Sequence, residues 1–138
     1  MDLLREVTDW LAGKTGLTLG QDLHAGNLPP EGQDLCAVVL ERGGVPAQPR
    51  LTGRIGAYAL QVLVRGPSYF QARDLAYQLD AWLSDCAGMD LPANSEWAIH
   101  VCQGVAAPQF LGFDGRGRPE FSTNYTLRGY EKAAWAAA

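Results

Sequence analysis

The chain has 138 residues, with 11 basic and 15 acidic side chains and a net charge of −4. A chain of this length buries about two-thirds of its surface on folding, which supports one hydrophobic core and is too little for two. Its hydrophobic fraction of 47% excludes a disordered chain, and its negative charge argues against a protein whose main task is to grip nucleic acid.

The sequence has no sign of a membrane span, a secretory signal or a disulfide framework. No apolar run approaches the roughly 18 residues that a membrane helix needs, and residues 1–6 alternate acidic and basic side chains instead of forming a signal peptide. The three cysteines, Cys36, Cys86 and Cys102, are widely spaced and form no Cys-x-x-Cys pair. We therefore expect the chain to fold in a reducing cytoplasm.

The N-terminal residues 2–12 carry apolar side chains at the three-to-four spacing of an amphipathic helix. Gly13 follows this pattern and is expected to end the helix. A brief extended stretch over residues 17–23 then leads into a turn-rich segment that contains Pro29 and Pro30.

Two strands are predicted in the next part of the chain. Residues 35–41 form a continuous apolar run, which is typical of a strand buried on both faces. Residues 57–65 alternate with the two-residue period of a second strand. The segment between them, residues 42–56, is rich in Pro, Gly and Arg and is predicted to be a loop that carries Arg50 and Arg54.

The clearest helix follows. Ser68 and Gln71 have the spacing of a capping box, in which the two side chains satisfy the unpaired amides of the first turn. Apolar residues over 72–86, with Trp82 among them, then form one stripe. Gly88 is expected to end this helix.

A third strand is predicted from about Trp97 to Val101, and the rest of the chain has the pattern of a β-hairpin. The arms of the hairpin are residues 109–113 and 120–130, and its turn is residues 114–118. This order of elements predicts an α+β fold: a mainly antiparallel sheet with one long and one short helix packed on one face, plus the C-terminal β-hairpin. We expect one domain over residues 1–130.

No catalytic, metal or cofactor site is expected. His100 and Cys102 lie two apart on a predicted strand, but a zinc site needs three or four ligands, and His24, Cys36 and Cys86 have no ligand spacing. The chain has neither the elbow of a serine nucleophile nor a Gly-rich phosphate loop. We therefore predict that the protein is not an enzyme.

Interaction residues are the alternative. Several arginines lie on predicted loops or at the hairpin turn, where their planar guanidinium groups suit contacts with another protein. Asp114 is expected to shape that turn, and Trp135 lies in an Ala-rich tail over residues 131–138. The predicted interface residues are Arg50, Arg54, Asp114, Arg116, Arg118 and Trp135.

Several short motifs also follow one another over roughly residues 25–130. They are Leu28-Pro29-Pro30, Gly43-Gly44-x-Pro46, Leu60-Gln61-Val62-Leu63-Val64-Arg65-Gly66, Ser68-Tyr69-x-x-Ala72, Pro108-x-x-Leu111-Gly112-x-Asp114-x-x-Gly117-Arg118 and Phe121-x-x-Asn124-Tyr125. As an ordered set, they resemble the phage minor capsid or tail-terminator (tail-completion) proteins.

The resemblance implies an α+β subunit of the virion that is assembled in the host cytoplasm and forms a ring, typically a hexamer, at the head-proximal end of the tail tube. Such a ring stops tube polymerisation and joins the head. The implied partners are further copies of the chain, the tail-tube protein and a head-completion or connector protein, with genomic DNA only as passing cargo and no membrane. Two alternatives stay open: a head-completion or connector protein, and a small α+β enzyme or ligand-binding domain around His100 and Cys102.

Overall fold

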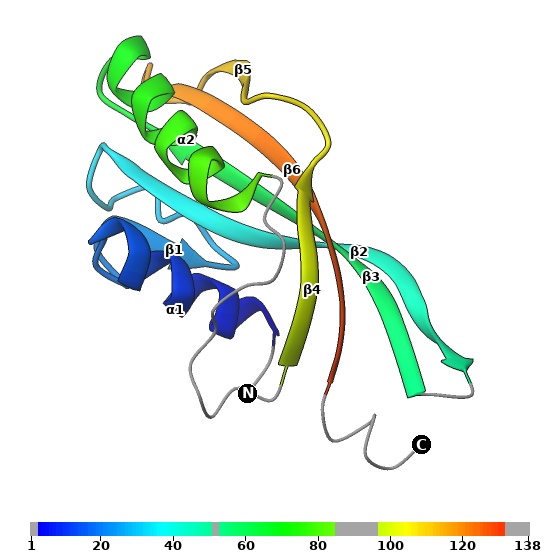
Figure 1. Ribbon diagram of the computed structural model, residues 1–138. Helices are drawn as coiled ribbons and strands as arrows, with labels where there is room; N and C mark the ends of the chain where they lie inside the picture. The colour runs from blue at the N-terminus through cyan, green and yellow to red at the C-terminus, as the bar shows by residue number, and fades with distance from the viewer. Residues whose placement is uncertain (1–2, 51–52, 85–96, 132–138) are drawn as a thin grey trace.

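The computed structural model describes residues 3–50, 53–84 and 97–131 (Figure 1). Two helices, α1 (Leu3–Thr15) and α2 (Tyr69–Leu83), pack on one face of a six-stranded sheet. The strands are β1 (Leu23–Ala25), β2 (Cys36–Arg50), β3 (Gly53–Arg65), β4 (Trp97–Gly104), β5 (Gln109–Phe113) and β6 (Pro119–Glu131). The predicted α+β fold with a C-terminal hairpin is confirmed.

The sheet is built around two long central strands, β3 and β6. Strands β1, β2, β3 and β6 lie side by side in that order, and the far edge of β6 is shared by two shorter strands. Residues 125–131 of β6 pair with β4, and residues 119–122 pair with β5. All pairs are antiparallel except β1–β2.

The core lies between the helices and one face of the sheet. Alternate residues of the strands, such as Val62 and Val64 of β3 and Leu127 of β6, are buried against Leu79 of α2 and Leu11 of α1. Burying each such side chain stabilises the fold by about 1.5–3 kcal/mol. The apolar faces of the strands and of helices α1 and α2 therefore pack together as one apolar layer.

The loop predicted over residues 42–56 is wrong. Strand β2 continues to Arg50 and β3 begins at Gly53, and these two residues pair with each other. Irregularities in the register between Glu41 and Gly44, and between Val45 and Gln48, accommodate the Pro- and Gly-rich composition. The predicted loop is therefore a β-ribbon.

The ends of the two strands, residues 46–50 of β2 and 53–55 of β3, are together called the arm below. Strand β3 pairs with β6 only as far as Gly56, which lies opposite Gly129. Beyond that point the described residues of the arm pair only with each other. Figure 1 shows the arm extending away from the helices and from β5.

The N-terminal elements differ from their predicted limits. Helix α1 runs through Gly13 to Thr15, and Gly16 ends it, with a φ of 78° and an amide that donates to the carbonyl of Ala12 at 3.0 Å. Its 13 residues make it nearly as long as α2, which has 15, so the expected short helix is a full-length one. The extended stretch predicted over residues 17–23 is also wrong, because residues 20–22 form a turn and strand β1 begins only at Leu23.

The start of α2 lies at the predicted cap. The hydroxyl oxygen of Ser68 accepts a hydrogen bond from the amide of Gln71 at 3.3 Å. The same hydroxyl donates to Gln71 Oε1 at 2.9 Å, so the glutamine side chain binds the cap hydroxyl rather than the cap amide of a full capping box.

The end of α2 differs from the prediction. The helix ends at Leu83, and Trp82 is 41% exposed rather than part of the core. Its ring packs edge-on against Trp10 of α1, with 6.4 Å between the ring centroids. Cys86 and Gly88, which were predicted to close the stripe and the helix, lie outside the described residues.

Gly66 joins β3 to α2 at a close approach of two backbones. A Cβ atom at this position would lie 2.9 Å from the backbone nitrogen of Ala72 and 3.0 Å from its Cβ. The amide of Gly66 also donates to the carbonyl of Pro119 at 3.1 Å, which ties this backbone to the start of β6. A side chain therefore cannot be added here without moving α2 or losing that bond.

We expect Gly66→Ala to lower the free energy of unfolding by roughly 1–3 kcal/mol, because the added methyl group overpacks against the first turn of α2. Gly115→Ala is the matched control, since no heavy atom lies within 4 Å of a Cβ atom built there, and its effect should stay within about 0.5 kcal/mol. Denaturant titration measures both variants. Equal free energies of unfolding for Gly66→Ala and Gly115→Ala would contradict the close approach of Gly66 to α2.

Candidate assembly interface

The turn between β5 and β6 is organised by the carboxylate of Asp114. Its Oδ1 atom accepts hydrogen bonds from the backbone amides of Arg116 and Arg118, both at 2.9 Å. The amide of Asp114 donates to the carbonyl of Arg118 at 2.9 Å, and Gly117 takes a φ of 75° to complete the turn. The side chain of Asp114 thus shapes the hairpin turn from within.

These contacts change the acidity of Asp114. The backbone amide of Arg118, then that of Arg116 and the Arg118 guanidinium, stabilise the ionised form and hold the pKa of Asp114 below its usual value. The carboxylate is therefore charged throughout the neutral and mildly acidic range, and the turn keeps its shape there.

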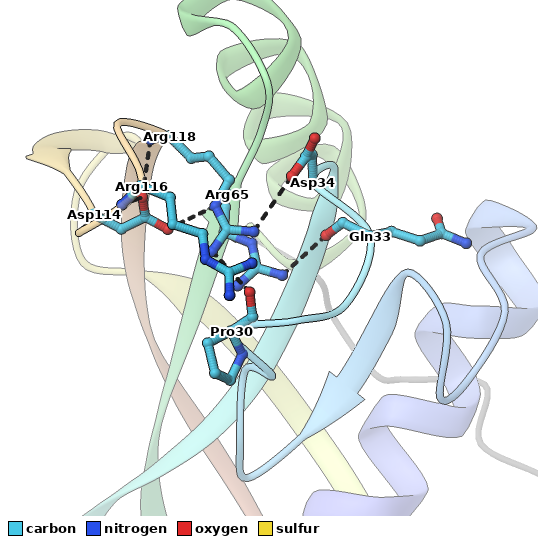
Figure 2. Close-up of polar contacts among 7 residues, drawn as sticks. All are labelled: Pro30, Gln33, Asp34, Arg65, Asp114, Arg116 and Arg118. Carbon is cyan, nitrogen blue, oxygen red and sulfur yellow. Dashed lines mark hydrogen bonds and ion pairs between the residues drawn. The ribbon is translucent and has the colours of Figure 1, made fainter.

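Arg118 is buried, with only 7% of its surface exposed. Its Nε atom donates to Asp114 Oδ2 at 2.8 Å, Nη2 donates to the carbonyl of Pro30 at 3.0 Å, and Nη1 donates to Asp34 Oδ1 at 3.3 Å (Figure 2). The guanidinium thus joins the hairpin turn to the loop that precedes β2. Arg118 lies in the predicted hairpin turn, but the loop before β2 covers its side chain, so the guanidinium already binds within the same chain.

A second buried arginine lies beside this link. Arg65, at the end of β3, is 2% exposed, and its Nη2 atom donates to the carbonyl of Gln33 at 2.9 Å (Figure 2). Among the described residues, its Nε atom has no hydrogen-bond partner. A buried guanidinium with an unused donor is costly unless another group reaches it.

The three arginines line one pocket of about 530 Å³, together with Asp114 and Glu120. We call it the arginine pocket. Arg116 is its exposed member, whereas Arg65 and Arg118 are buried. Burial, reinforced by the neighbouring Asp114 carboxylate, raises the pKa of Glu120. The pocket therefore combines two fixed cationic groups with one exposed arginine.

The remaining predicted interface residues lie elsewhere. Arg50 and Arg54 are in the strands of the arm, with Arg50 opposite Gly53 and Arg54 opposite Pro49, so their prediction as loop residues is wrong. They are at the other end of the β2–β3 ribbon from the arginine pocket. Their side chains and the whole of Trp135 lie outside the described part of the structure.

The sequence analysis did not single out Arg65, Glu120 or Asp34. Arg65 ends the strand directly before a glycine, and its place on the face opposite Val64 was visible in the alternation. That pattern indicated a charged group at the sheet end. It did not indicate burial, which depends on the loop over residues 30–34.

The residues weighed as metal ligands are not brought together. Cys36 of β2 and Cys102 of β4 are buried thiols on strands that β3 and β6 separate, and burial raises the pKa of Cys36. His24 lies in β1. Within the part of the chain described, no group of three or more His, Cys, Asp or Glu is placed to hold a metal. Cys86 and the side chain of His100 fall outside that part.

The protein is a single sheet of the α+β class with two helices on one face, and its charged groups link distant segments and line a surface pocket. Residues 10–131 match the family described as bacteriophage tail terminator protein. The chain belongs to this family and is a structural protein of the phage tail, located in the virion. No helix in the described residues has the length and apolar character needed to cross a membrane.

Solved structures show the same fold at low sequence identity, with 15 matching chains. One belongs to the virion of a native gene transfer agent particle; it is 13% identical, with 92% of this chain and 93% of that chain covered and a TM-score of 0.62. A second is also 13% identical, with coverage of 91% and 89% and a TM-score of 0.55. A search of curated proteins finds no match.

We expect Asp114→Asn to lower the Tm at neutral pH, because the neutral amide loses the charge-assisted contacts of the turn. Since the pKa of Asp114 is lowered on folding, its carboxylate stabilises the fold above the ordinary value of 3.8, and this contribution is lost as the pH falls through the folded-state pKa. The difference in Tm between the wild-type protein and Asp114→Asn should therefore become smaller below about pH 4. Thermal unfolding from pH 2.5 to 7 measures it, and a gap that does not change with pH would contradict the assignment.

Proposed function

We propose that this protein forms a closed ring at the head-proximal end of the phage tail tube, where it ends tube polymerisation and provides the surface to which the head joins. The observation that carries this proposal is the match of residues 10–131 to the tail terminator family. The role requires protein contacts and no chemistry, so we propose that the protein is not an enzyme and uses no cofactor.

The charge of the chain suits a ring through which DNA passes. The net charge of −4 weakens non-specific contact with a polyanion, because phosphate binding needs a surplus of basic groups. Genomic DNA is therefore proposed only as cargo. The partners are further copies of this chain, the tail-tube protein and a head-completion or connector protein.

Within this assembly, the arginine pocket is proposed to receive a carboxylate from a neighbouring subunit or from the tail-tube protein. Guanidinium groups bind carboxylates through paired, planar hydrogen bonds. Asp114 and Asp34 already occupy the side chain of Arg118, whereas Arg116 is exposed at the pocket. Arg116 is thus the residue placed to reach a partner, and Arg118 holds the turn that presents it.

We expect Arg116→Glu to change the Tm little, because the side chain is exposed, and to give tails of irregular length or tails that fail to join heads. Arg116→Lys keeps the charge but not the planar fork and should be impaired less. Arg118→Glu, in contrast, should lower the Tm, since it leaves an anionic group beside Asp114 and Asp34 in place of their partner. Electron microscopy of complemented phage and thermal unfolding give both readouts.

Two outcomes separate the parts of this proposal. Normal tail length and infectivity of the Arg116→Glu phage would overturn the role of the pocket and leave the ring untouched. A reconstruction of the phage neck that shows a single copy of the chain attached at one point would overturn the ring itself.

A further inference from the structure

Four aromatic side chains gather on the surface where β5 meets the start of α2. Tyr69, Phe70, Phe110 and Phe113 are 42%, 69%, 39% and 66% exposed, and together we call them the aromatic surface. A folded monomer gains little from such a cluster in water, and contiguous apolar surface of this kind marks a site of interaction.

The aromatic surface is continuous with the core. The ring centroids of Tyr69 lie 5.3 Å from Phe70 and 5.4 Å from Phe110, and Phe110 lies 5.5 Å from Phe113. Buried Phe121 of β6 supports the cluster from below, at 5.2 Å from Tyr69 and 5.5 Å from Phe110. The apolar layer under α2 therefore reaches solvent at this edge of the sheet.

A β-bulge in β5 builds this cluster. Phe110 lies opposite Phe121 and Gly112 lies opposite Glu120, so one extra residue is inserted between them, and Gly112 takes a φ of 121°. In a regular strand, residues 110 and 113 would point to opposite faces. The inserted residue brings Phe113 beside Phe110, as bulges do where a side chain has to be re-aimed.

The arm, residues 46–50 and 53–55, is the second feature, because no third strand pairs with it among the residues that the structure describes. A two-stranded ribbon is only marginally stable in water without a third strand or a packing surface. Residues 42–57 contain three arginines, Arg42, Arg50 and Arg54, and no acidic residue, in a chain whose net charge is −4. Pro46 and Pro49 lie in β2 of the arm and disfavour further strand pairing along that edge, so side chains are left to make the contact.

We infer that the arm of one copy docks on the aromatic surface of the next copy. This inference rests on the proposed ring, because a ring built head to tail needs two different, complementary patches on each chain. The arm begins at the Gly53 end of β3, and the aromatic surface lies near its Arg65 end, about 40 Å away at 3.3 Å per residue. Figure 1 shows the arm and β5 at opposite ends of the sheet.

The chemistry of the two features is complementary. Arginine stacks on the electron-rich faces of Phe and Tyr rings. The chain already makes such a contact on α2, where the Arg73 guanidinium lies 4.7 Å from the centre of the Tyr77 ring. Arg50 and Arg54 of the arm supply guanidinium groups for the same kind of contact with the exposed rings.

Charge reversal tests the pairing. Phe113 is exposed, so its replacement should not disturb folding of the monomer. We expect Phe113→Arg to weaken ring assembly about ten-fold or more, because the arginines of the arm repel the new positive charge. Phe113→Glu should weaken assembly less, because the same arginines attract the new negative charge. Phe113→Tyr is the control and should assemble normally. In an Arg50→Glu, Arg54→Glu background, Phe113→Glu should instead weaken ring assembly more than Phe113→Arg does.

Ring assembly is measured by mass photometry of the purified full chain, and by the fraction of complemented phage tails that have normal length. If Phe113→Arg weakens ring assembly more than Phe113→Glu does both with and without the two arginine substitutions, the pairing of arm and aromatic surface is overturned.

Cross-linking tests which surfaces meet. Gln48→Cys places a thiol on the arm, and Leu111→Cys places one in the bulge beside Phe110; a Cys86→Ser background leaves only the buried Cys36 and Cys102 in addition. With a short bismaleimide, chains that carry both thiols should give a ladder of multimers, and a mixture of the two single variants should stop at dimers.

The outcomes are distinct. Dimers of the Leu111→Cys chain alone would show that the aromatic surface pairs with itself, and a product with the tail-tube protein would assign it to that partner; each result overturns the inference. Rings that form without arm-to-surface cross-links would overturn the docking and leave the proposed function standing. Absence of any ring on the tail would instead overturn the proposed function.

Discussion

The buried guanidinium of Arg118 is the constraint on which one end of this molecule depends. A charge with so little exposure is tolerated only when it is paired and hydrogen-bonded. Its partners come from the hairpin turn, through Asp114, and from the loop before β2, through Asp34 and the carbonyl of Pro30. Segments 84 residues apart are thereby held together. The position of β5, and of everything that β5 presents, follows from this link.

Two different surfaces meet at this end because neighbouring residues of β6 point to opposite faces of the sheet. Glu120 lines the arginine pocket on the face away from the helices. Phe121, the next residue, is buried under α2 and supports Tyr69 and Phe110. A polar pocket and an apolar surface thus lie back to back on one hairpin. A partner that contacts one of them need not compete for the other.

The long β2–β3 ribbon connects this end to the arm. Its central part is covered by helices on one face and pairs with β6, whereas its far part has no third strand among the described residues. An elongated chain with a different surface at each end suits head-to-tail assembly, which needs two complementary patches on each copy. The family of tail terminator proteins, to which the chain belongs, provides the setting in which we propose that these surfaces act.

Local patterns in the sequence determined the presence of two helices, the cap at Ser68, the first hairpin arm over residues 109–113 and the turn at Asp114, because these depend on residues a few positions apart. Contacts between distant segments decided the rest. Pro, Gly and Arg between residues 42 and 56 indicated a loop, yet the two halves pair as strands. Arg118 was predicted to contact another protein from the hairpin turn, yet a loop from another part of the same chain covers it. Neither result can be derived from local propensity, because each depends on a partner that only the folded chain brings within reach.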